Sequence, residues 1–172
     1  NFGKCELLEM DGSQEILFRS GEHMKKVDKA KYLGGILTKK ADSSTEIQAR
    51  LTATTPVVTS LDSFWKKTNC SMAWKLLIFQ AVVISKLLYG LETLIVTEAT
   101  LHKLNTFQMK GLRKILGIPP TFIDRTHTDE SVRQHIKEEY DIEIKPLTET
   151  LREKMMKLLG HVIRAKEDDP MK

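Results

Sequence analysis

The sequence predicts an α+β fold that is mostly helical, with a small β region at the N-terminus. Apolar residues alternate with polar ones in short runs over the first 42 residues, whereas from Ser43 onward they follow a helical period of about 3.6 residues. The chain has 172 residues, of which 41% are hydrophobic and 29% charged, so it is long enough to bury a core. We expect three regions: a β-hairpin region over 1–42, a three-helix bundle over 43–118 and a further helical segment over 119–172.

Turn residues divide the first region into short strands. Asp11-Gly12-Ser13 separates the runs 5–10 and 15–19, which predicts a hairpin because glycine tolerates the positive φ of a tight turn. Ser20-Gly21 predicts a second turn. A further strand or hairpin is expected over 30–37, interrupted by the paired glycines.

Three helices are predicted for the bundle. The first begins at Ser43, which forms a capping-box pattern with Glu46, and Pro56 is expected to kink or divide it. The second begins at Ser71 and ends at Tyr89-Gly90. Its apolar stripe is expected to form the core together with residues of the third helix: Trp74, Leu77, Ile78, Ala81 and Val82 with Leu104, Phe107, Leu112 and Ile115.

The third helix is predicted from Thr97 to Gly117, a residue that readily takes the left-handed conformation at a helix end. A shorter helix is expected over 128–140. A final helix should begin at Lys145-Pro146, because proline suits a first helical turn. The chain begins at Asn1 without an initiating methionine or an apolar leader, and we interpret it as a segment of a longer protein.

The sequence contains no clear catalytic or metal-binding pattern. The two cysteines lie 65 positions apart and the five histidines show no zinc-ligand spacing, while Asp168-Asp169 lies in a charged tail. No membrane span is predicted, because the longest apolar stretch is interrupted by Gln80 and followed by Lys86. We expect no catalytic residue, metal or cofactor in this chain.

Positive charge is concentrated in the middle region. Residues 43–118 carry 9 basic and 4 acidic groups, against 8 and 7 before them and 10 and 12 after them. Lys103, Lys110 and Lys114 are seven and four positions apart and form one stripe on the third helix, with Arg113 beside it. The stripe could follow a phosphate backbone or could be an ordinary solvated face. Further candidate phosphate contacts are Lys66, Lys67 and Lys75. Tyr32 could present its ring to a nucleotide or be a buried strand residue.

Five motifs in this order resemble the C-terminal part of non-LTR (LINE-like) retrotransposon reverse transcriptases. They are Lys31-Tyr32-Leu33-Gly34, Glu46-Ile47-x-x-Arg50, Leu87-Leu88-Tyr89-Gly90-x-Glu92-Thr93, Leu112-Arg113-Lys114-Ile115-Leu116-Gly117-Ile118 and Leu158-Leu159-Gly160-His161-Val162-x-Arg164. Asn1-x-x-Lys4-x-Glu6 also resembles the palm motif that follows the catalytic aspartates in that family.

The resemblance implies roles for several residues. Lys4 would lie near the phosphates of the incoming nucleotide, and Tyr32, Leu33 and Gly34 would form the tip of the primer grip. The helical bundle would be the thumb, which holds an RNA–DNA or RNA template–primer duplex. The metal-binding aspartates would precede Asn1, where Mg²⁺ would bind, so this chain alone is expected to be inactive as an RNA-directed DNA polymerase. Its partners would be nucleic acid and the fingers and palm of the parent enzyme, without a membrane.

The expected location is intracellular, and nuclear if the role of the parent element is retained. The alternative function is a degenerate helical interaction or assembly module with no nucleic-acid role of its own. A free-standing helix-turn-helix DNA reader fits less well, because the chain lacks a short turn leading into a polar recognition helix.

Overall fold

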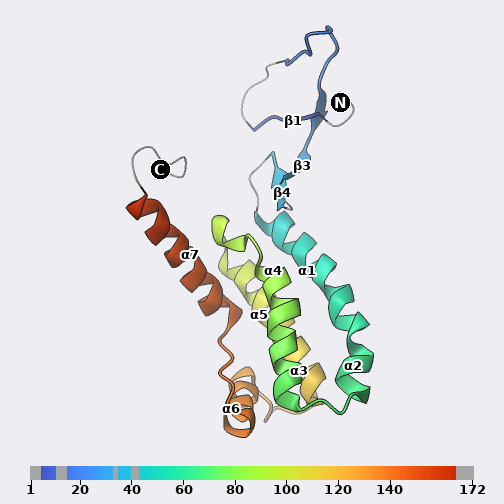
Figure 1. Ribbon diagram of the computed structural model, residues 1–172, viewed down its shortest axis with the longest axis vertical. Coiled ribbons are helices and arrows are strands. Elements are labelled where there is room, and N and C mark those ends of the chain that lie inside the picture. The colour runs from blue at the N-terminus through green and yellow to red at the C-terminus, as the bar shows by residue number, and fades with distance from the viewer. Residues whose placement is uncertain (1–4, 11–14, 33–34, 40–42, 166–172) are drawn as a thin grey trace. The chain divides into compact units, whose positions relative to one another are not determined.

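The computed structural model confirms the mostly helical α+β fold (Figure 1). It describes residues 5–10, 15–32, 35–39 and 43–165. Packing divides the chain into two compact units, residues 1–49 and 50–172, and the division falls within the first helix. Residues 119–165 therefore belong to the same unit as the bundle. The three-region division at 42 and 118 stays a prediction.

The first unit contains two small sheets. β1 (Glu6–Leu8) pairs in parallel with β2 (Lys25–Val27), and β3 (Lys29–Tyr32) pairs antiparallel with β4 (Gly35–Thr38). The second pairing confirms the hairpin expected over 30–37. Leu33 and Gly34, expected at its tip, lie outside the described residues.

The hairpin expected between residues 5–10 and 15–19 is wrong. The strand β1 pairs with β2, and not with residues 15–19. Residues 15–19 instead belong to a local turn, in which Leu17 bridges His23 and Gly21 has a φ of 86°. A turn signal predicts that the chain reverses but leaves open which strands then pair. The intervening chain is long enough here for a parallel connection.

The first predicted helix is α1 (Ser43–Ser60), followed by α2 (Asp62–Lys67). Pro56 lies inside α1 without ending it, and the break comes at Leu61. Near the start of α1, the buried Glu46 carboxylate accepts a hydrogen bond of 2.6 Å from the Ile36 backbone N–H. This bond joins the helix to β4 within the first unit.

The second predicted helix is a continuous rod over 72–88 (Figure 1). It consists of α3 (Met72–Ile78), the π-helix η2 (Phe79–Ile84) and α4 (Ser85–Leu88). After Gly90 follows the 3₁₀ turn η3 (Leu91–Thr93). The Ser71 hydroxyl accepts a hydrogen bond from Trp74 N–H, and Gly90 has a φ of 73°. Both predicted ends of this helix are therefore confirmed.

The core face of this rod differs from the predicted one. Trp74, Leu77, Ala81 and Val82 are exposed and Ile78 is half-buried, whereas the opposite face is buried. The buried side chains are Leu76, Phe79, Val83, Ile84, Leu87, Leu88 and, after the rod, Leu91. The rod is apolar on both faces, so the hydrophobic period alone did not determine which one packs inward.

The π-helix explains a further detail of this packing. In a regular α-helix of 3.6 residues per turn, Leu88 would lie on the same side of the rod as the exposed Trp74. In the structure Leu88 is buried. The backbone N–H of Ser85 bonds Gln80 O, five residues back. Such a turn adds one residue and rotates everything after it by about 100°. Leu88 is thereby brought onto the same side as Leu76.

The remaining helices are α5 (Glu98–Leu116), α6 (Asp129–Tyr140) and α7 (Leu147–Arg164). Leu104, Leu112 and Ile115 of α5 are buried as predicted, and Phe107 is half-buried. α7 packs on α5 through polar contacts. Gln108 Nε2 donates to Lys145 O at 3.0 Å, and Asn105 Oδ1 accepts from Thr148 N–H at 3.2 Å. The final helix therefore folds against the bundle.

Within the described residues, the stretch Met72–Thr93 is long and apolar enough to cross a membrane by length and composition. In its most apolar window 39% of the residues are buried inside the protein. Core helices of soluble proteins meet the same criterion. The absence of a membrane partner stays a prediction.

Candidate nucleic-acid interface

The basic stripe lies on α5, the longest helix of the second unit. Both ends of α5 are well defined: Thr97 and Thr100 exchange capping bonds at the start, and Gly117, with a φ of 71°, ends the helix. The buried leucines face the bundle, while Lys103, Lys110 and Lys114 are exposed. Three cations thus share one side of a packed helix over a length of about 16 Å.

Two of these cations have no acidic partner in the part of the chain that the structure describes. Among the described residues, Lys103 and Lys110 make no ion pair, whereas Lys114 Nζ lies 2.6 Å from Asp62 Oδ1 of α2. An unpaired exposed ammonium group can release counterions when it meets a phosphate. Lys103 and Lys110 are therefore the strongest phosphate-binding candidates of the stripe.

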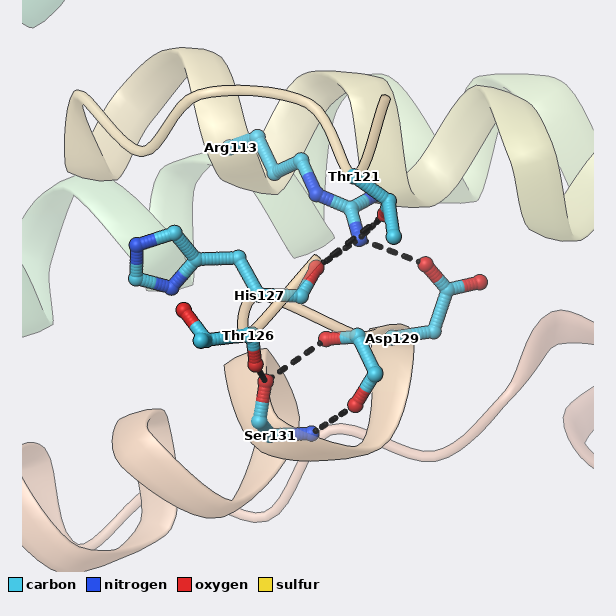
Figure 2. A network of polar contacts seen from close by, with 7 residues as sticks. Arg113, Thr121, Thr126, His127, Asp129 and Ser131 are labelled. Atoms are coloured by element: carbon cyan, nitrogen blue, oxygen red, sulfur yellow. Dashed lines mark hydrogen bonds and ion pairs between the residues drawn. The ribbon is translucent and has the colours of Figure 1, made fainter. Parts of the chain in front are cut away.

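Arg113 is directed into the protein and holds the loop after α5 (Figure 2). Its side chain is only 11% exposed. Its Nη2 donates to three acceptors: Asp129 Oδ1 at 2.7 Å, His127 O at 2.9 Å and Thr121 Oγ1 at 3.1 Å. Asp129 neutralises the guanidinium charge. This placement is at odds with the phosphate contact expected of Arg113. The side chain instead holds the loop after α5 in place.

The loop carries further internal bonds. Asp124 Oδ1 accepts from Thr126 Oγ1 at 2.6 Å and from Thr126 N–H at 2.9 Å, and these bonds lower the pKa of Asp124 below its ordinary value. Ser131 Oγ donates to Thr126 O and Thr128 O at the start of α6 (Figure 2). The segment between α5 and α6 is consequently tied at both ends.

Lys75 is also internal. It is 7% exposed, and its Nζ donates to Trp65 O at 2.7 Å. This placement is at odds with the expected phosphate contact. Lys66 and Lys67, at the end of α2, are exposed and have no ion pair within the described part of the chain.

The primer-grip candidates lie in the first unit. Tyr32 is exposed at the end of β3, opposite Gly35, which excludes a buried strand tyrosine. Leu33, Gly34 and Lys4 lie outside the described residues.

A cleft of about 660 Å³ opens beside the stripe, and we call it the α5 cleft. It is bounded by the C-terminal half of α5 and the loop after it. Its lining residues are Thr106, Met109, Lys110, Arg113, Lys114, Ile118, Pro120, Thr121, Phe122 and Asp129. The cleft therefore combines apolar and basic side chains.

Sequence analysis did not identify Phe122 or the acceptors of Arg113. Phe122 is 86% exposed on the loop that follows α5. In the sequence, the position of Phe122 directly after Pro119-Pro120-Thr121 could have indicated an aromatic residue on a turn. In the described ranges, no group of three or more His, Cys, Asp or Glu side chains could hold a metal ion.

Comparison of the chain with protein-family models, with curated proteins and with solved structures finds no match. The functional argument therefore rests on the residues of the chain itself.

Proposed function

We propose that this chain is the palm-edge and thumb portion of a non-LTR reverse transcriptase and that it grips the backbone of a template–primer duplex. The duplex is RNA–DNA or RNA, as the motif resemblance implies. The grip is made by Lys103 and Lys110 of α5, supplemented by Lys114 and by Lys66 and Lys67 of α2.

One observation carries this proposal. Lys103 and Lys110 are exposed on the same side of a packed helix, and neither is neutralised by an acidic side chain among the described residues. Contacts of this kind attract any duplex, because phosphates carry charge but no base identity. We leave Arg113 and Lys75 out of the grip, because Arg113 Nη2 donates to Asp129 and Lys75 Nζ donates to Trp65 O inside the protein.

The test is a salt titration with an RNA–DNA hybrid. In the variant Lys103→Gln/Lys110→Gln, the slope of log affinity against log salt should flatten by roughly 1.8, twice the value of about 0.9 per phosphate contact of a B-form duplex. Neither substitution breaks an ion pair between described residues, so the fold should be unaffected. Binding is measured by fluorescence anisotropy with two hybrids of unrelated sequence.

The matched control is Lys137→Gln/Lys157→Gln, which removes the same charge from exposed positions of α6 and α7. Its slope should equal that of the wild type. Equal slopes for all three proteins would refute the proposed grip, as would a change in the preference between the two hybrids.

The second candidate function is a helical assembly module, and a specific observation favours it. Trp74 is 62% and Leu77 49% exposed, on a rod that also presents Val82 to solvent. Several large apolar side chains exposed on one helical rod are consistent with an interaction surface. The fingers and palm of the parent enzyme would cover it.

The two candidates differ in their response to salt and to substitution. An assembly module would bind the hybrid weakly and with little salt dependence, and Trp74→Ser/Leu77→Ser would change its self-association in light scattering. The duplex grip predicts a steep salt dependence that this variant leaves unchanged.

A further inference from the structure

The α5 cleft has one wall that the packing holds in place. Arg113 bonds Thr121 at one end of the loop segment and Asp129 at the other, and Thr121 Oγ1 itself donates to His127 O at 3.1 Å. These bonds fix the loop against α5 without a bound ligand. A preformed cleft lowers the entropic cost of binding.

Phe122 projects from this wall. The segment from Pro120 to Ile123 forms a tight turn, closed by a hydrogen bond of 2.9 Å from Ile123 N–H to Pro120 O. Phe122 lies at the third position of this turn and is 86% exposed while lining the cleft. The ring is therefore accessible on a backbone that is itself restrained.

Two lysines also line the cleft. Lys110 has no acidic partner among the described residues, and Lys114 remains about one-third exposed beside Asp62. Among the described residues, the acidic side chain that lines the cleft is Asp129, and it forms an ion pair with Arg113. The cleft thus favours an anionic ligand.

The lining also contains the apolar side chains of Met109, Ile118 and Pro120 and the hydroxyls of Thr106 and Thr121. Its volume of about 660 Å³ falls in the range of small-ligand sites. A flat apolar group joined to a phosphate matches a cleft that is lined by an aromatic ring and two lysines. A nucleotide has both groups.

We propose that the α5 cleft binds one nucleotide of a single nucleic-acid strand. The base stacks on Phe122 and the phosphate lies between Lys110 and Lys114. The inference rests on the proposed duplex grip, since these two lysines also belong to the stripe. It adds a single-strand site at the end of that stripe.

The test compares two probes on the full chain. One is a labelled single-stranded oligonucleotide of about ten nucleotides, a length within the site sizes of single-strand binders. The other is the RNA–DNA hybrid. Phe122→Ala should weaken binding of the single strand about 5- to 150-fold, which corresponds to the loss of one base stack. Phe122→Tyr should retain that affinity, and neither change should alter hybrid binding.

Trp74→Ala is the matched control, because it removes another exposed aromatic ring that does not line the cleft. It should leave the affinity for the single strand unchanged. A third probe, free adenosine monophosphate, separates a strand from a free nucleotide. The proposal requires the oligonucleotide to bind more tightly than the monophosphate.

The outcomes separate this inference from the duplex grip. Wild-type affinity for the single strand in Phe122→Ala would overturn the cleft site while leaving the grip intact. Equal affinity for the monophosphate and the oligonucleotide would overturn the strand assignment. If the hybrid shows no salt-dependent binding while Phe122→Ala still weakens the single strand, the grip fails and the cleft stands.

Discussion

The adjacent leucines of α3 provide a direct measurement of which face of the rod is buried. Leu76 is 0% exposed and Leu77 is 49% exposed. Leu76→Ala should cost about 2 to 5 kcal/mol of unfolding free energy, since it removes buried methyl groups and leaves a cavity. Leu77→Ala should cost about 1 kcal/mol or less, because half of its side chain already contacts water and solvent fills the space. The sequence analysis instead placed Leu77 in the core.

The assay is urea unfolding followed by tryptophan fluorescence. Trp65 is buried and packs edge-on against Phe64, with ring centroids 4.9 Å apart, so its emission should report unfolding of the second unit. With a slope of about 2 kcal/mol per molar urea, a loss of about 3 kcal/mol lowers the midpoint by about 1.5 M. A loss of about 1 kcal/mol lowers it by about 0.5 M.

Both variants carry the same chemical change at neighbouring positions of one helix, so helix propensity cancels between them. The reasoning is refuted if Leu77→Ala shifts the midpoint as far as Leu76→Ala does. A changed slope in either variant would point to an altered denatured state and would disqualify the comparison.

Three further predictions follow from individual contacts. Gly111→Ala should lower the unfolding free energy by about 1 to 3 kcal/mol, because its Cβ would lie 2.5 Å from Cε2 of the buried Phe79; an increase in the urea midpoint would contradict this. Lys75→Met should lower the unfolding free energy by about 1 to 3 kcal/mol, because the Trp65 carbonyl loses its hydrogen-bond donor. The dependence of hybrid binding on salt should stay unchanged. A flatter dependence would show that Lys75 belongs to the grip. The hydrogen bond from Lys145 Nζ lowers the pKa of Glu153 and raises that of Lys145. The Glu153 contribution to stability should therefore be present above its ordinary pKa of 4.5 and fade as the pH falls through the lowered folded-state pKa. An NMR titration of Lys145→Gln should show the Glu153 pKa returning towards its ordinary value, and an unmoved pKa would argue against the pair.

Helix ends were predictable because they depend on neighbouring residues. A hydroxyl at Ser71 or Thr97 satisfies free N–H groups one turn ahead, and a glycine at 90 or 117 takes the positive φ that ends a helix. Both interactions span a few positions and therefore leave a readable pattern. The same holds for the exposed lysines of α5, whose spacing places them on one side of any helix.

Pairing and burial depended on distant residues. The rod from Met72 to Leu88 is apolar on both sides, so its inner face was determined by packing, including the close approach of Phe79 to Gly111 of α5. The π turn then rotated Leu88 into the core, a shift that a 3.6-residue count does not contain. The sequence likewise grouped Arg113 and Lys75 with the other cations, whereas the tertiary structure placed Asp129 and the Trp65 carbonyl against them. A charged side chain belongs to a surface or to the interior according to which partners the fold brings within hydrogen-bonding distance, and for these two the partners lie ten or more positions away in the sequence.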